Sequence, residues 1–256
     1  MGEAMLAAIL KKGVAKPEAI IVSDIADPRR KLLARKYRVA VTGSNQHVVE
    51  IGDILVLAIK PQNMAEVIKE LKGCLKPSQL VLSIIAGAKT KTLSRRLRHD
   101  SIVRAMPNTP AQIGEGMSVW TATAGVTEQQ RAWAGSILGA MGKEVYVDDE
   151  KYIDMATAVS GSGPAYFFLM VEALVNAAVG IGLPREKALE MVLQTMLGSG
   201  HLIQRSGKEP AELRRMVTSP GGTTAQALLQ LEKGKFTALI KQAVKAAYKR
   251  AKELGR

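Results

Sequence analysis

The segment Thr218–Thr224 combines the residue types of an anion-binding turn. It reads Thr-Ser-Pro-Gly-Gly-Thr-Thr and leads directly into a helical pattern. Glycines let the backbone approach a ligand, and the free N–H groups and the dipole at a helix start attract negative charge. The hydroxyls of Ser219, Thr223 and Thr224 gather at the same place, so we expect an anion site. A helix cap formed by Thr223 or Thr224 would explain those threonines alone, but not two glycines after a proline.

Side chains suited to acid–base catalysis or metal binding are sparse elsewhere. His47, His99 and His201 stand alone in segments expected at the surface. Cys74 has no partner motif, and we interpret it as a structural residue. No group of histidine, cysteine and carboxylate residues has the spacing of a metal site, so no metal is expected.

The first thirteen residues predict part of a dinucleotide-binding turn. Gly2 opens a helix over residues 3–12, and a strand follows at residues 19–23. In a Rossmann-like fold this helix follows the first strand and a G-x-G-x-x-G turn, so Gly2 would be the third glycine. We therefore expect a chain that lacks that strand and two glycines, through a start assigned about ten residues late or because it is a fragment. The alternative is that Met1 is simply a start and no such strand exists.

The residues after the second strand leave the cofactor preference open. Asp24 follows Gly2 by 22 residues, close to the spacing at which an acid binds the ribose 2′-hydroxyl of NAD. Arg29 and Arg30 lie one turn further on, where they could meet the 2′-phosphate of NADP. Ser23 is compatible with either cofactor.

Four motifs resemble those of pyrroline-5-carboxylate reductases, in the order that the family has them. They are Ala58-Ile59-Lys60-Pro61, Arg104-Ala105-Met106-Pro107-Asn108-Thr109-Pro110, Val159-Ser160-Gly161-Ser162-Gly163-Pro164-Ala165-Tyr166, and residues 210–232 around the glycine-rich turn. Together they cover essentially the whole chain. One departure is the pair Arg214-Arg215, which stands where the family commonly has an acidic residue.

The resemblance implies an enzyme that reduces 1-pyrroline-5-carboxylate to L-proline with NADPH or NADH, the last step of proline biosynthesis. It implies that Ser219 and Thr224 line the substrate and the nicotinamide as catalytic residues. The substrate-binding residues that it implies are Gly221, Gly222, Thr223 and Thr224. The implied cofactor-binding residues are Gly2, Ser23, Asp24, Asn45, Ala58, Ile59, Lys60, Pro61, Ala86 and Asn108. It also implies a homodimer, which in this family is often assembled further into decamers.

This reaction needs no strong acid. The C=N nitrogen of the substrate is basic enough to bind protonated near neutral pH, and an iminium is already electrophilic. Hydride delivery then needs mainly orientation and electrostatic preorganisation. The hydroxyl of Thr224 is expected to hydrogen-bond the ring nitrogen and relay a proton.

Residues 1–148 alternate short apolar runs with helical segments, which is typical of parallel strands buried on both faces and joined by helices. Strands are expected at residues 19–23, 38–41, 54–58, 80–85, 101–106, 116–122 and 143–147, and helices at 28–36, 62–71, 92–98 and 128–140. The pattern predicts an α/β fold: a Rossmann-like NAD(P)-binding domain over residues 1–148.

Helical patterns replace strands after residue 148. They are expected at residues 150–159, 165–182, 185–206, 224–233 and 235–254. The segment Ala165–Ile181 is apolar nearly all round, and a bundle of about 105 residues has limited interior in which to bury it. We therefore predict an all-helical domain over residues 149–256 that pairs with a second subunit, and the family resemblance implies that this domain also binds the substrate.

Composition excludes several classes of protein. Of the 256 residues, 47% are hydrophobic and 23% charged, which indicates a globular chain rather than a disordered one. The net charge is +13, yet the basic residues are spread along the chain and only 4% are aromatic, so no nucleic-acid partner is expected. No apolar run approaches the roughly 20 residues that span a bilayer, and the N-terminus lacks the charge order of a signal peptide. With one cysteine, these features favour a soluble, cytoplasmic protein without a membrane partner.

Three other functions stay open at this point. A related NAD(P)-dependent dehydrogenase acting on a hydroxyacid or another imine generally places a lysine on the long helix, where the nearest amide or amine is Asn176. A truncated scaffold of the same fold with impaired cofactor binding would follow from loss of the first strand. A basic nucleic-acid binder is the least favoured.

Overall fold

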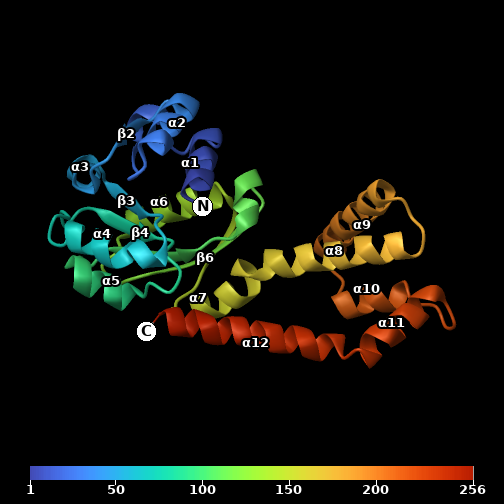
Figure 1. Cartoon of the computed structure of the whole chain (residues 1–256). Helices are drawn as coiled ribbons and strands as arrows, with labels where there is room; N and C mark the ends of the chain where they lie inside the picture. Colours follow the sequence, from blue (N-terminus) through green and yellow to red (C-terminus); the bar gives the residue numbers. More distant parts are fainter. Residues whose placement is uncertain (256) are drawn as a thin grey trace. The chain divides into compact units, whose positions relative to one another are not determined.

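The computed structural model describes residues 1–255, which form two compact units (Figure 1). One unit contains Met1–Ser162 together with the end of the last helix, from Ala246 onward, and we call it the α/β unit. The other contains Gly163–Lys245 and is called the helical unit. The domain boundary predicted between residues 148 and 149 stays a prediction. The two units are defined by how compactly their residues pack, and such a boundary need not coincide with the boundary between evolutionary domains.

The α/β unit alternates helices and strands, as the sequence predicts. In chain order its elements are α1 (Gly2–Lys11), β1 (Ile21–Ser23), α2 (Asp27–Tyr37), β2 (Ala40–Thr42), α3 (Asn45–Ile51), β3 (Ile54–Leu57), α4 (Met64–Leu71), β4 (Leu80–Ser83), α5 (Thr90–Leu97), β5 (Ile102–Met106), β6 (Gly116–Ala122), α6 (Glu128–Gly139), β7 (Gly142–Tyr146) and α7 (Lys151–Ala156). Short 3₁₀ turns lie at Pro17–Ala19, Pro61–Asn63 and Thr109–Ile113, and a π turn at Thr157–Gly161 follows α7. Helix α3 is an element that the sequence analysis did not predict.

The strands form two sheets. Strands β1 and β2 pair in parallel, and a five-stranded sheet has the order β3-β4-β5-β6-β7. In the larger sheet only the β5–β6 pair is antiparallel. Within residues 1–255, no strand links the two sheets. The strand expected ahead of Gly2 stays a prediction.

Helices cover both faces of the larger sheet (Figure 1). Alternate residues of one strand point to opposite faces, so Leu80 and Leu82 of β4 join the core with α1 and α6. The intervening Val81 joins the core formed with α3, α4 and α5. All three side chains are fully buried. This two-sided burial explains why the strands of this sheet read as unbroken apolar runs.

Helix α1 packs against both sheets. Its Met5 and Ala8 belong to the core of the larger sheet, whereas Leu6 packs with Leu33 and Val39 beside the β1–β2 pair. The helix that begins at Gly2 therefore holds the two sheets in one unit.

The helical unit consists of α8 (Gly163–Gly180), α9 (Arg185–Ser206), α10 (Pro210–Met216), α11 (Thr223–Lys233) and the first part of α12 (Phe236–Leu254). The sequence analysis predicted these helices except α10. Among residues 163–245, only Gly163, Val175 and Ala188 are buried. Large apolar side chains face outward instead, as in Phe168, which is 65% exposed.

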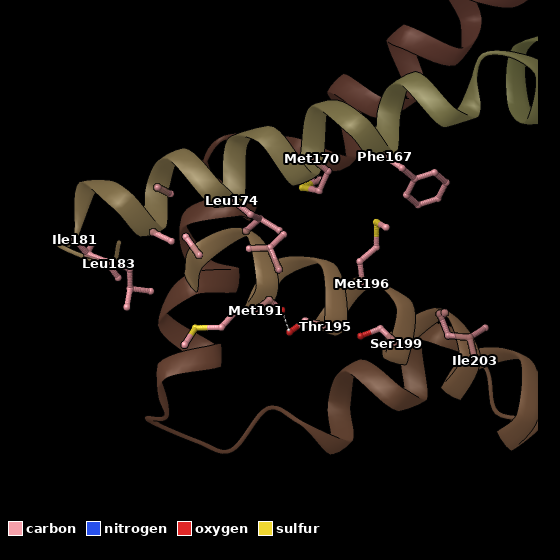
Figure 2. A pocket seen from close by; sticks show the side chains of 15 residues that line it. Phe167, Met170, Leu174, Ile181, Leu183, Met191, Thr195, Met196, Ser199 and Ile203 are labelled. Atoms are coloured by element: carbon pink, nitrogen blue, oxygen red, sulfur yellow. Dashed lines mark hydrogen bonds between the residues drawn. The ribbon is translucent and has the colours of Figure 1, made fainter. Parts of the chain in front are cut away.

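An open apolar groove lies between α8 and α9 (Figure 2). Its volume is about 810 Å³, and Phe167, Met170, Leu174 and Met196 are among its lining side chains. The groove also contains Thr195, whose hydroxyl donates to a backbone carbonyl 2.7 Å away. The groove thus presents mainly hydrocarbon and sulfur atoms.

The stretch Lys151–Gly180 is long and apolar enough to cross a membrane, judged by length and composition alone, and 17% of its most apolar window is buried. The expectation that no apolar run approaches this length is therefore wrong. A helix that a second subunit covers meets the same criteria.

Candidate active site

The predicted cofactor residues gather at the carboxyl ends of parallel strands, where open α/β sheets bind their ligands. Ser23 ends β1 and Asp24 follows it, while Asn45 opens the helix after β2. In the larger sheet, Ala58, Ile59, Lys60 and Pro61 follow β3, Ala86 follows β4 and Asn108 follows β5. The predicted cofactor residues therefore lie at corresponding edges of both sheets.

Gly2 fits the role of a glycine beside a dinucleotide. It is the first residue of α1, and a Cβ atom placed on it would lie 3.1 Å from the Cβ of Ala58. A larger residue would push the helix away from the end of β3. The helix start also offers free N–H groups, which attract a pyrophosphate. These residues fit a nicotinamide dinucleotide.

One carboxylate oxygen of Asp24 is available to bind a ligand. Its Oδ1 accepts a hydrogen bond from the Ala26 N–H at 2.8 Å, and its Oδ2 has no partner among residues 1–255. Arg30 donates to the carbonyl oxygens of Asp24 at 2.7 Å and Ile25 at 3.1 Å, and it pairs with Asp27 at 3.0 Å. The guanidinium considered for a 2′-phosphate is thus largely engaged within the chain.

Glu3, in the first turn of α1, binds three side chains of α2. It accepts hydrogen bonds from Arg29, from Lys36 at 2.9 Å and from Tyr37 at 2.8 Å. The hydrogen bond from Lys36, followed by those from Tyr37 and Arg29, lowers the pKa of Glu3 to about 2. This cluster joins the two helices and engages the second arginine considered for NADP.

Asn45 and Lys60 differ in whether their side chains already have a partner within the chain. The Asn45 side chain donates to Glu70 of α4 at 2.8 Å. Lys60 is exposed after β3, and its side chain has no hydrogen bond or ion pair within the described chain. Lys60 is therefore a cation that can meet a phosphate.

Asn108 holds two backbone segments with its side-chain amide. Its Oδ1 accepts from the Met117 N–H at 2.9 Å, and its Nδ2 donates to the Ser160 carbonyl at 3.0 Å. The cofactor contact expected of Asn108 stays a prediction. The link to Ser160 is a role that the sequence analysis missed, because the two residues are 52 positions apart.

The glycine-rich turn ends at Gly222, which caps α11 through its backbone, so neither threonine is the cap. Gly221 has a φ of +73°, a left-handed conformation that favours glycine. The hydroxyls of Ser219, Thr223 and Thr224 have no hydrogen-bond partner among residues 1–255, and Thr224 is half-buried. Three hydroxyls and the start of a helix are thus free to receive a ligand.

The histidines do not supply an acid–base pair. The expectation that His99 lies at the surface is wrong: it is buried, with Nε2 2.7 Å from the carbonyl oxygen of Gln79. This contact follows from the position of His99 just after α5, which packs on the sheet. Cys74 is an exposed free thiol. No cluster of three or more potential metal ligands occurs within residues 1–255.

Comparison with known proteins identifies the family. The sequence pattern of the pyrroline-5-carboxylate reductase dimerisation domain matches residues 150–254, and that of coenzyme F420-dependent NADP oxidoreductases matches residues 1–87. The pyrroline-5-carboxylate reductase of Synechocystis sp. is 42% identical over 256 residues, with all of this chain and 95% of the relative covered. The chain belongs to the pyrroline-5-carboxylate reductase family. The resemblance seen in the four motifs is confirmed.

Other members of the pyrroline-5-carboxylate reductase family agree in sequence and fold. The Arabidopsis thaliana reductase is 39% identical, covering 99% of this chain and 92% of its own length. The structure of the Coxiella burnetii reductase has a TM-score of 0.91 at 36% identity, covering all of this chain and 95% of that chain. The Plasmodium falciparum reductase with NADP bound also has a TM-score of 0.91, at 32% identity with the same coverage. The predicted fold class is confirmed.

Proposed function

We propose that this protein reduces the C=N bond of 1-pyrroline-5-carboxylate to give L-proline, with NADPH or NADH as the cofactor. The observation that carries the proposal is the glycine-rich turn with three unpartnered hydroxyls at the start of α11. It occurs in a chain that belongs to the reductase family throughout its length.

The α/β unit would hold the cofactor, which supplies a hydride when bound. The start of α1 at Gly2 suits the pyrophosphate, and the exposed Lys60 adds a positive charge after β3. The free Oδ2 of Asp24 suits a ribose hydroxyl. Ser23, Asn45, Ala58, Ile59, Pro61, Ala86 and Asn108 complete the proposed cofactor set.

The turn before α11 would hold the carboxylate of the substrate. The Gly222 N–H is already bonded to the Ser219 carbonyl at 3.1 Å. The anion would therefore be received by the N–H groups of Thr223 and Thr224 in the first turn of the helix, which have no partner within the helix. Gly221 lets the turn adopt its left-handed conformation.

The hydroxyls of Ser219 and Thr224 would orient the ring and carry its proton. A protonated imine needs no strong acid: its N–H would donate to the hydroxyl oxygen of Thr224. After hydride transfer the ring nitrogen is a neutral amine, which would accept a hydrogen bond from this hydroxyl and gain a proton from solvent through it. Fixed dipoles at the helix start favour the bound charge distribution without reorganisation.

The proposed assembly is a homodimer formed through the apolar face of α8 and α9. The groove between these helices offers mainly apolar atoms (Figure 2), which suit a protein surface better than a polar metabolite. The matched family domain is one of dimerisation. A decamer and a cytoplasmic location stay predictions.

Turnover tests the proposed function directly. Oxidation of NADPH and NADH is followed with 1-pyrroline-5-carboxylate, and L-proline is identified in the product mixture. Removing a hydroxyl that contacts the reacting ring is expected to lower kcat by about 10²-fold in Thr224→Ala, with a smaller loss in Ser219→Ala. The control is Ser136→Ala, an exposed serine of α6, which is expected to keep full activity. Absence of proline with the wild-type protein would contradict the proposal.

A further inference from the structure

Arg104 is a buried cation in the middle of β5, and no step described above uses it. Its side chain is 3% exposed, with Nη1 2.9 Å from Glu150 Oε1 and Nη2 2.7 Å from Asp154 Oδ1. A buried ion pair is weak evidence for stability, because desolvation offsets much of the attraction. Its geometry, by contrast, is restrictive, since the planar guanidinium fork holds two carboxylates in fixed directions.

Glu150 extends this cluster to a third element. Its Oε1 accepts from the Thr90 N–H at 2.8 Å, and its Oε2 accepts from the Thr90 hydroxyl at 2.9 Å. Thr90 is the first residue of α5, and Glu150 is the N-cap of α7. The cluster therefore joins β5, the start of α5 and both ends of the first turn of α7.

Two of these elements lead to residues of the proposed cofactor site, and the third leads to the π turn that Asn108 contacts. The loop before α5 contains Ala86, β5 runs into Asn108, and α7 runs into the π turn that contains Ser160. A second contact closes the arrangement, since Asn108 donates to the Ser160 carbonyl at 3.0 Å. The segment 150–160 is thus held at its start by Arg104 and at its end by Asn108.

The space around the π turn is tight as well. A Cβ atom at Gly161 would lie 3.1 Å from the Cε of Met106, the last residue of β5. π turns within helices frequently occur at functional sites. The turn lies at the end of the α/β unit, since α8 begins only two residues after it.

We propose that Arg104 is a positioning residue for the reductase reaction. Its two ion pairs fix α7 and the Thr157–Gly161 turn against β5 and the start of α5. They would thereby fix the position of Asn108 and the neighbouring part of the proposed cofactor site, which hydride transfer requires. This inference rests on the proposed function. Misplacing reacting groups by about 1 Å can cost roughly 10²-fold in rate, so even a folded variant is expected to be slow.

The first test compares Arg104→Lys with wild type. Lysine keeps the charge but cannot bind two carboxylates in the same fork. We expect kcat to fall at least about tenfold while KM for the cofactor changes less than about threefold. The deuterium isotope effect on kcat, measured with cofactor deuterated at the transferred position, is expected to increase because hydride transfer becomes more rate-limiting. The control is Arg131→Lys, on the surface of α6, which is expected to match wild type.

The second test separates positioning from folding. In the variant Arg104→Met/Glu150→Gln/Asp154→Leu the buried charges are removed together, a change that proteins often tolerate. We expect its urea midpoint to stay near that of wild type while kcat stays low. Amide hydrogen exchange of residues 157–162 is expected to be faster in both Arg104 variants, with α6 unchanged.

The outcomes separate this inference from the proposed function. Failure of wild type to form proline contradicts the function itself. If wild type turns over and Arg104→Lys has the same kcat and the same isotope effect, the positioning role is wrong. It is also wrong if exchange of residues 157–162 does not change, or if the charge-free variant recovers full kcat.

Discussion

The two units of this protein bury their apolar residues to very different extents. The α/β unit packs Leu80, Val81 and Leu82 of one strand into cores on both faces of its sheet. Among residues 163–245 of the helical unit, only Gly163, Val175 and Ala188 are buried, while Phe167 is 63% exposed. The α/β unit therefore has its own core, and the helical unit is expected to obtain one from a second copy.

The residues proposed to bind cofactor and substrate are divided between the two units. The proposed cofactor residues, from Gly2 to Asn108, lie in the unit that has its own core. The hydroxyls of Ser219 and Thr224 lie in the unit that lacks one. Turnover is thus expected to depend on assembly, whereas cofactor binding is expected to depend on it much less.

The largest effect is expected from a charge on the apolar groove. In Phe167→Glu the new carboxylate would be buried unpaired at the proposed subunit interface, which is strongly unfavourable. We expect mainly monomer by light scattering and a fall in turnover of about 100-fold or more. The control is Ile113→Glu, which is 75% exposed in the α/β unit and is expected to remain dimeric and active. A Phe167→Glu protein that stays dimeric would contradict the comparison between the units.

A cavity in the α/β core is expected to have the next largest effect. Leu82 is fully buried, so Leu82→Ala is expected to lower the free energy of unfolding by about 2–5 kcal/mol. The dimer should persist in this variant under native conditions, as measured by sedimentation. The matched change, Met191→Ala, shortens a half-exposed groove residue and is expected to weaken dimerisation instead. If the two variants behave alike, the two units do not differ in the way described.

Features that are local in the sequence were predictable, whereas features set by tertiary packing were not. The strands of the larger sheet were predictable because burial on both faces leaves unbroken apolar runs, as in residues 80–83. Helix α3 was missed because it has only seven residues, and its clearest signal is the Ser44 cap, whose hydroxyl accepts from the His47 N–H at 3.2 Å. Short helices carry too few residues for a periodic pattern to be distinctive.

In the candidate site, too, residues adjacent in the sequence were predicted and pairs far apart in the sequence were not. The turn at residues 218–224 was predictable because its glycines and hydroxyls are adjacent in the sequence. The cluster of Arg104, Glu150 and Asp154 was not predicted, because its partners are 46 and 50 positions apart. His99 was misplaced for a similar reason, since its partner Gln79 lies on a different element. Pairings set by tertiary packing leave no local pattern.

A moderate effect is expected from the backbone of the substrate turn. Gly221 has a φ of +73°, so Gly221→Ala is expected to shift the turn and raise KM for 1-pyrroline-5-carboxylate about tenfold at unchanged KM for the cofactor. The control is Gly135→Ala within α6, where the nearest atom to a new Cβ lies 3.9 Å away. That change is expected to stabilise slightly, by up to about 1 kcal/mol. Equal KM values in both variants would argue against the role of the turn.

The smallest expected effect concerns Glu3 and depends on pH. The pKa of Glu3 is lowered from 4.5 to about 2, so its contribution to stability is present above pH 4.5 and is lost as the pH falls toward 2. Because its partners are partly exposed, Glu3→Gln is expected to cost about 1 kcal/mol at neutral pH, and less in acid. Urea unfolding of both proteins across this range measures the difference. A cost that grows toward acid pH would contradict the assignment. Glu128→Gln, at a side chain that is 97% exposed, is the control.

The central claim is that the helical unit acquires its core from a second copy, and the protein-concentration dependence of urea unfolding tests it most directly. Unfolding is followed by far-ultraviolet circular dichroism, which is dominated here by helices, over a hundredfold range of protein concentration. Mass action predicts that the apparent free energy of unfolding rises by about 2.7 kcal/mol over this range, with a corresponding rise in the midpoint. A midpoint that is independent of protein concentration would show that each chain is stable alone and would contradict the account.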